Sequence, residues 1–155
     1  MTKYIKFLLV LLVVTVLSGC TSKLDTAECS FESKQSDYKI ESKYKIYYKK
    51  NIVKKVDIDE VITSSSKDKL EEFSNSFKSQ YESNNSMYGG YTYDIKINKD
   101  KLKLSVSIDY TVFDMNKFIN NNAAMKDYVN KSNNLTIDGI IKMYEASGST
   151  CSKNK

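Results

Sequence analysis

Three cysteines, Cys20, Cys29 and Cys151, carry the most reactive side chains of this 155-residue chain. A thiol can bind a metal, form a disulfide, act as a nucleophile or carry a lipid, and its sequence context decides between these roles. No C-x-x-C pair is present, and the chain contains no histidine. A zinc set and a redox pair are therefore not expected, and we predict no metal site and no cofactor.

Cys20 follows a segment typical of exported bacterial proteins. Two lysines among the first six residues precede an apolar run over residues 7–17, which is shorter than the roughly 20 residues needed to span a bilayer. Residues 17–20 (LSGC) resemble a bacterial lipobox. The resemblance implies that residues 1–19 are a removed signal peptide and that Cys20 carries acyl chains such as palmitate. Two acyl chains anchor stably, so we expect attachment to the extracytoplasmic face of the bacterial cell membrane. A plain secretory leader with an incidental cysteine is the alternative.

Cys29 and Cys151 remain once Cys20 is set aside. Exported chains meet oxidising conditions, and an even number of remaining cysteines favours pairing. A Cys29–Cys151 disulfide would close a loop of more than 100 residues, worth about 4–5 kcal/mol in the chain-entropy model. The alternative is two free thiols near the chain ends.

The other group with chemical capacity is the acidic cluster Asp57, Asp59 and Glu60. Paired carboxylates cleave glycosides, so an enzyme that acts on the cell wall through carboxylates is the alternative function. Asp57 and Asp59, however, share a strand face that we interpret as solvent-exposed. The serines at 64–66 have no histidine to activate them and are better explained as helix caps. We therefore predict no catalytic residue and a protein that is not an enzyme.

Period-two alternation of apolar and polar residues predicts two β-hairpins. The first joins residues 38–49 to 52–62, and the second joins 91–97 to 102–110. Most tyrosines fall on the apolar strand faces and are expected in the core. The better candidates for exposed rings are Tyr47, Tyr88 and Tyr128.

Helical spacing of apolar residues predicts two helices, at 67–83 and 136–147, whereas residues 115–131 form either a short helix or a loop. The predicted fold class is α+β: a mostly antiparallel sheet of four to five strands with two or three helices packed on one face. We divide the chain into the signal peptide 1–19, a lipidated tether 20–28 and a single domain 29–155.

Composition limits the choice of partners. The formal charge is +5, and removing the two leader lysines leaves 5 − 2 = +3. That charge is too small, and too scattered, for a nucleic-acid surface. All basic residues are lysine, so the bidentate clamps that arginine forms on phosphate or carboxylate are absent.

Several segments together resemble the YehR-like family of small bacterial lipoproteins: the lipobox at 17–20, the strand pair at 44–62, the helix 68–81, the run Val106-Ser107-Ile108-Asp109-Tyr110, and the helix 137–144 followed by Gly148. The resemblance implies the fold and the cell-envelope location, but no assigned activity and no site. The Cys29 and Cys151 pair is not expected from that family.

These observations predict a membrane-anchored extracytoplasmic lipoprotein whose domain binds without catalysing. The expected partners are the membrane, through the lipid, and an envelope protein or a wall polymer, with no nucleic acid.

Overall fold

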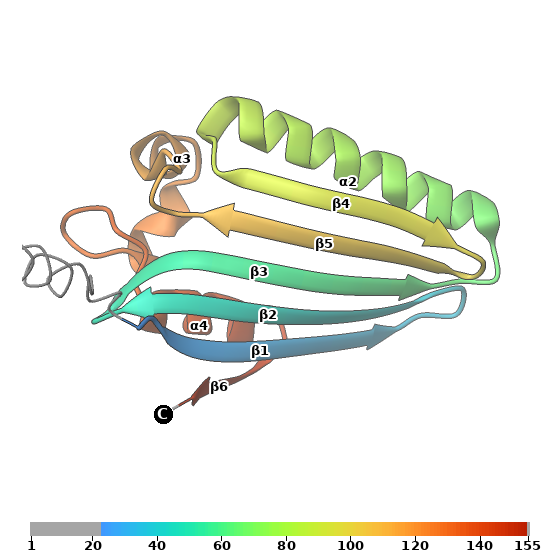
Figure 1. Cartoon of the computed structure of the whole chain (residues 1–155), viewed down its shortest axis with the longest axis horizontal. Helices are drawn as coiled ribbons and strands as arrows, with labels where there is room; N and C mark the ends of the chain where they lie inside the picture. Colours follow the sequence, from blue (N-terminus) through green and yellow to red (C-terminus); the bar gives the residue numbers. More distant parts are fainter. Residues whose placement is uncertain (1–22, 155) are drawn as a thin grey trace, which may run out of the picture.

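The computed structural model describes residues 23–154, so the predicted signal peptide 1–19 and the lipidation at Cys20 lie outside the described residues. One antiparallel sheet of six strands runs through the described domain in the order β4-β5-β3-β2-β1-β6 (Figure 1). Its strands are β1 (Asp25–Lys34), β2 (Lys39–Lys49), β3 (Ile52–Thr63), β4 (Tyr91–Asn98), β5 (Lys101–Asp109) and β6 (Thr150–Asn154).

Both predicted hairpins are confirmed. β2 pairs with β3, and β4 pairs with β5, each through a tight turn. Lys50 and Lys99 adopt positive φ angles of 59° and 56° in these turns, so the backbone of one residue in each turn is in the left-handed region. β3 then pairs with β5, which joins the two hairpins into one sheet.

The predicted number of four to five strands was wrong, because the sheet has six. The short edge strand β6 has no apolar alternation in its sequence TCSKN, and it pairs only with β1. β1 also begins earlier than expected. Residues 25–28, which we assigned to the tether, pair with the end of β2 and belong to the sheet.

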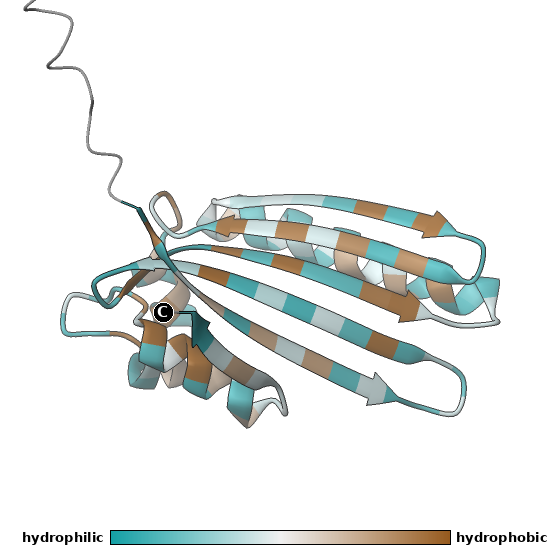
Figure 2. Cartoon of the chain, turned by 60° about the horizontal axis from the view of Figure 1, so that its bottom comes forward, coloured by the Kyte–Doolittle hydropathy of each residue, from teal (hydrophilic) through white to brown (hydrophobic). Residues whose placement is uncertain are grey.

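The helices lie on one face of the sheet, as predicted (Figure 2). They are α2 (Lys67–Tyr88), α3 (Met115–Asn121), the 3-10 helix η2 (Ala123–Tyr128) and α4 (Ile137–Ala146). The uncertain segment 115–131 therefore contains two short helices. Within residues 23–154, no helix is both long and apolar enough to cross a membrane.

The caps of α2 and α4 explain where these helices begin and end. The Ser66 and Thr136 side chains accept hydrogen bonds from the backbone N–H groups of Lys69 and Gly139, at 3.3 and 3.0 Å. α2 continues past residue 83, where we expected it to end, and stops at Gly89, whose φ is +71°. Tyr88, in its last turn, is only 6% exposed, so tertiary packing extends the helix through a stretch rich in Asn and Ser.

The core divides into three clusters of buried side chains between the sheet and the helices. One lies under α4, one beside the last turns of α2, and one beside its first turns. Their most deeply buried members are Ala27, Ile46, Val56, Ile62, Leu70, Leu102 and Ile140. α2 packs mainly on β4, whereas α4 packs on β6 and η2 and covers a core cluster that includes Ile46 of β2 and Val56 of β3.

Candidate functional site

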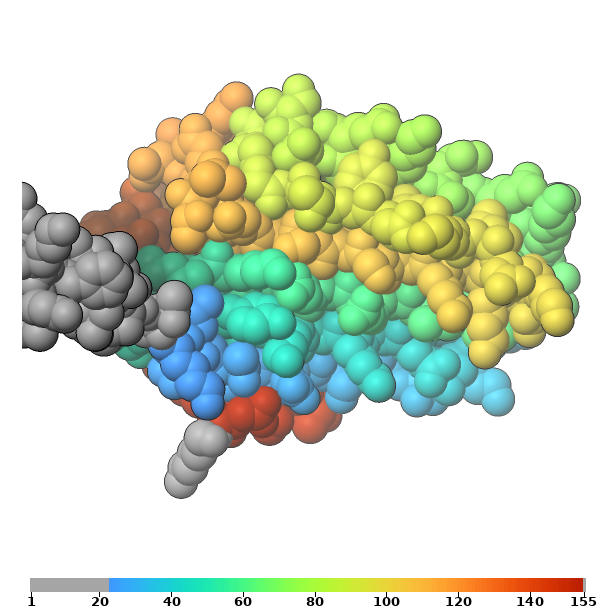
Figure 3. Space-filling model, viewed as in Figure 1, coloured from blue at the N-terminus to red at the C-terminus, as the bar shows by residue number. Residues whose placement is uncertain are grey.

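Among residues 23–154, no helix covers the second face of the sheet. Figure 3 shows strands β1 to β5 exposed side by side across this surface, which we call the open face. Strand register places on it the polar side chains that alternate with the core residues. The open face comprises Glu28, Ser30, Lys43, Lys45, Tyr47, Lys55, Asp57, Asp59, Thr92, Asp94, Lys103, Ser105, Ser107, Thr150 and Ser152.

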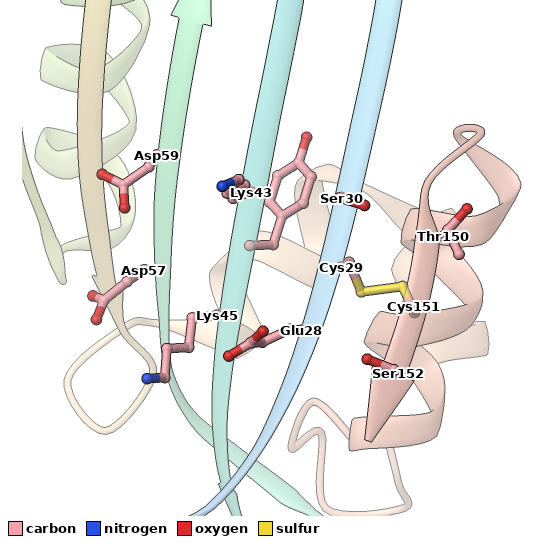
Figure 4. Close-up of a pocket in the computed structure, with 11 residues that line it drawn as sticks. Glu28, Cys29, Ser30, Lys43, Lys45, Asp57, Asp59, Thr150, Cys151 and Ser152 are labelled. Atoms are coloured by element: carbon pink, nitrogen blue, oxygen red, sulfur yellow. A yellow bond between two sulfur atoms is a disulfide. The ribbon is translucent and has the colours of Figure 1, made fainter. Parts of the chain in front are cut away.

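Two hollows adjoin on the open face. The first has a volume of about 450 Å³ and spans β6, β1, β2 and β3 (Figure 4). Its lining carries lysines, carboxylates and hydroxyls, with the Cys29–Cys151 disulfide at one side. The second, about 480 Å³, spans β3, β5 and β4. Asp57 and Asp59 line both, so the two hollows form one band across all six strands.

Asp57 and Asp59 are held by neighbours on the open face. Lys55 Nζ lies 2.9 Å from Asp57 Oδ1, and Ser105 Oγ donates to Asp59 Oδ1 at 2.8 Å. Burial acts to raise the pKa of Asp57, but the hydrogen bonds from Lys55 and Ser107 outweigh it and leave the pKa below the ordinary value. Asp57 is therefore ionised at neutral pH and suited to accepting hydrogen bonds.

Glu60 does not belong to this group, although the sequence placed it in the same cluster. It lies on the helix-covered face, between the inward-facing positions 58 and 62 of β3. Ser42 Oγ, on the neighbouring strand, donates to Glu60 Oε2 at 2.7 Å. Burial raises the pKa of Glu60, and the hydrogen bond from Ser42 offsets only part of that effect. The predicted acidic cluster is thus two open-face carboxylates and one carboxylate among core residues.

Tyrosines from several elements gather near Glu60 on the helix-covered face. Burial raises the pKa of Tyr81 to about 12, with a further contribution from the charge of Glu60 and from Tyr91 and Tyr44. The pKa values of Tyr110 and Tyr144 are also raised by burial. The Tyr44 and Tyr144 rings stack with centroids 4.3 Å apart. These hydroxyls are therefore un-ionised at neutral pH, and the charge of Glu60 contributes to the raised pKa values of Tyr44 and Tyr81.

The three tyrosines expected to be exposed behave differently from one another. Tyr47 is on the open face, half-buried, with Lys45 Nζ and Lys55 Nζ at 5.6 and 5.4 Å from its ring centroid. Tyr128 is also half-buried. Tyr88 was wrongly expected to be exposed: it packs against Phe113 and Phe118, and its hydroxyl accepts a hydrogen bond from Asn121.

The structure contains the disulfide between Cys29 and Cys151, which are directly opposite each other on β1 and β6. The serines at 64–66 include two structural residues: Ser66 caps α2, and Ser64 Oγ donates to the Asp37 carbonyl at 2.8 Å. Within residues 23–154, no group of three or more His, Cys, Asp or Glu is placed to hold a metal ion.

The surroundings of Glu60 were not predicted from the sequence. The available signal was its position, because an acidic residue at 60 interrupts the inward-facing series Val56, Ile58 and Ile62. The tyrosines that gather on this face of the sheet come from β2, α2, β4 and α4, and their convergence depends on the tertiary fold rather than on any local pattern.

Two solved structures share this fold. An NMR structure of a protein from Streptococcus pneumoniae TIGR4 aligns with a TM-score of 0.52 and 15% identity over 85% of this chain and 87% of that one. An NMR structure of the E. coli YehR protein aligns with a TM-score of 0.56 and 15% identity, over 87% of this chain and 95% of YehR. No protein-family model and no curated protein sequence matches the chain.

These alignments define the class of the fold: a single α+β domain built on one antiparallel sheet with helices on one face. Within that class it is the YehR-like fold, so the resemblance inferred from sequence is confirmed at the level of structure. At 15% identity the likeness extends to the fold alone.

Proposed function

We propose that this protein is a lipid-anchored extracytoplasmic lipoprotein whose domain is a non-catalytic binding module. The lipobox-like residues 17–20 and the apolar run before them support the anchor. The Cys29–Cys151 disulfide supports a location outside the cytoplasm, because disulfides persist in oxidising compartments.

The open face is the observation that carries the binding role. The polar face of an antiparallel sheet is commonly exposed to water. Here that face also carries two adjoining hollows, which form a continuous band. The side chains that line the band are mainly carboxylates, ammonium groups and hydroxyls. Such a lining suits a long, hydroxyl-rich ligand that exchanges hydrogen bonds with water for hydrogen bonds with protein. We therefore assign the open face to a wall polymer.

The alternative, an enzyme that uses carboxylates, is less well supported by the geometry. Glycoside cleavage needs one carboxyl group with a raised pKa, as the acid, facing a second carboxylate across the bond. The pKa of Asp57 is lowered, whereas that of Glu60 is raised but on the opposite face of β3. A protein partner in the envelope is the other occupant that the test below distinguishes.

Lipidation is tested by labelling cells with an alkynyl fatty acid and comparing the native protein with Cys20→Ala. We expect label on the native protein, and an unlabelled variant that retains its leader. Equal labelling of both proteins would end the lipoprotein proposal. Export is checked separately, by accessibility of an epitope tag at the carboxyl end to protease added to intact spheroplasts.

Binding is tested by co-sedimentation of the full chain, in non-ionic detergent, with purified cell-wall sacculi. We expect the double variant Asp57→Asn/Asp59→Asn to bind at least about fivefold more weakly, because it removes two carboxylate hydrogen-bond acceptors. The matched control is Glu71→Gln/Glu72→Gln, which removes the same charge from exposed positions on α2. Equal binding by both double variants, or no sedimentation of the native protein, contradicts the wall-polymer assignment and favours a protein partner.

A further inference from the structure

Glu60 is a carboxylate without a counter-ion on the apolar side of the sheet. It is partly buried, and its only hydrogen bond from residues 23–154 comes from the Ser42 hydroxyl. None of the ion pairs among those residues includes it. Burying an acid without a cation costs stability, and a leucine or isoleucine at position 60 would avoid that cost. The acid therefore points to a function that needs its charge.

An aromatic row leads along α2 to this carboxylate. The rings of Phe73, Phe77 and Tyr81 follow one another at i, i+4 spacing, with centroids 6.2 and 6.3 Å apart. Tyr38 meets Phe73 edge-on at 5.1 Å and extends the row at its far end. The row therefore presents aromatic surface from the start of α2 to the neighbourhood of Glu60.

One end of the row already holds an ammonium group. Lys69 Nζ lies 5.9 Å from the ring centroids of both Tyr38 and Phe73, within cation–π range, and 3.7 Å from Asp37 Oδ2. At this end the chain supplies cation, ring and carboxylate together. At the other end it supplies the rings and Glu60, and residues 23–154 place no lysine in an ion pair there.

Strand register brings Tyr44 into the same place. Tyr44 pairs with Ile58 and Ser42 pairs with Glu60, so Tyr44 and Glu60 are diagonal neighbours on one face of β2 and β3. Tyr81 packs against the same core cluster as Ile58, the strand partner of Tyr44, and the charge of Glu60 contributes to the raised pKa of both tyrosines. Tyr44, Tyr81 and Glu60 each keep part of their surface in water. Carboxylate and rings are thus close together and reachable from solvent.

We propose that Glu60, Tyr44 and Tyr81 form a binding site for an organic ammonium ion, which we call the ammonium site. The carboxylate supplies the opposite charge, and the negative faces of the rings attract an organic cation. A hydrated inorganic ion fits such a site less well, because its water shell keeps the charge away from the rings. A bare divalent metal would need more oxygen ligands than this single carboxylate and its hydroxyl neighbours provide. The site lies on the opposite face from the open face and does not depend on the wall-polymer or lipid-anchor proposals.

The test is a titration of the full chain, in non-ionic detergent, with choline, followed by the NMR signals of the tyrosine rings. The matched probe is 3,3-dimethylbutan-1-ol, which has the shape of choline but no charge. We expect saturable shifts with choline and at least about tenfold weaker binding of the alcohol. Sodium chloride at the same concentration controls for ionic strength.

Two variants locate the effect. Glu60→Gln keeps size and hydrogen-bonding capacity but removes the charge, and we expect choline binding to weaken at least about tenfold. Glu145→Gln removes a charge beside Tyr144 from an exposed position on α4, and we expect no change. Unchanged binding in Glu60→Gln overturns the proposal. So do equal affinities for the two probes, or no saturation up to about 0.1 M choline. Because the two probes are compared on the native protein, the test stands even where a variant folds poorly.

Discussion

Side-chain alternation along β3 gives three neighbouring carboxylates different environments. Asp57 and Asp59 lie on the open face, where Lys55 and Ser105 contact them, whereas Glu60 faces the core with a hydroxyl as its only partner among residues 23–154. The three residues are close in sequence, but successive side chains of a strand point to opposite faces of the sheet, so residue 60 faces the other way from residues 57 and 59. The chemistry of each acid therefore follows from its parity in the strand.

The raised pKa of Glu60 predicts how stability depends on pH. Because the folded state holds the Glu60 proton more tightly than the unfolded chain, stability from this group is present below the unfolded pKa, near 4.5, and is lost as pH rises through the folded pKa. The groups that face Glu60 are Ser42 and Tyr44 on β2 and Tyr81 on α2, and the two tyrosines stay un-ionised across this range.

We therefore expect Glu60→Gln to raise the free energy of unfolding at pH 7 and to leave it nearly unchanged at pH 4. Urea denaturation at the two pH values measures this, with Glu145→Gln as the control for losing one negative charge. A variant that is less stable than the native protein at pH 7 would show that the Glu60 charge stabilises the fold.

Adding a side chain at Gly139 should lower the stability of the fold. A Cβ at this position would lie 2.1 Å from the Tyr128 carbonyl oxygen, so α4 and the end of η2 approach each other as closely as a glycine allows. Gly→Ala within a helix ordinarily gains about 1 kcal/mol. Here we expect Gly139→Ala to lose about 1–3 kcal/mol through steric overlap. Urea denaturation measures the loss, and Lys142→Ala, at an exposed position of α4, should stay within about 0.5 kcal/mol of the native protein.

Elements with a regular pattern were predictable, and those fixed by partners were not. The two hairpins and α4 show clear periodicity, and the structure confirms them. β6 consists of polar residues at a sheet edge, where only one neighbour and one disulfide define it. The last turn of α2 runs against local propensity and is held by the burial of Tyr88.

The disulfide predicts how strongly β6 depends on β1. Cys29 and Cys151 are 122 residues apart in sequence, and Cys29 is only 2% exposed. We expect Cys29→Ala/Cys151→Ala to lower the free energy of unfolding by about 2–5 kcal/mol. Reductant should destabilise the native protein by a similar amount and leave the double variant unaffected. Equal stability of native protein and variant, with no response to reductant, would contradict this role.

The molecule as a whole has two unlike faces. The helices and the buried rings cover one face of the sheet, and the other face carries the polar band. The sequence predicted the open face, because alternation marks its residues directly. The gathering of tyrosines about Glu60 was not predictable, because it joins residues from β2, α2, β4 and α4 that no local pattern relates.

The early start of β1 sets the stance of the domain on a bilayer. With lipid at Cys20, as we propose, five residue steps reach Asp25, a leash of at most about 18 Å. Asp25 pairs with Tyr48, so the β2–β3 turn and its Lys50 sit beside the leash and closest to the head groups. The 12 residues of β3 extend about 40 Å from the β2–β3 turn, and the β4–β5 turn lies at the far end of that strand. With the lipid that we propose at Cys20, so short a connection would keep the domain within about 18 Å of the membrane surface.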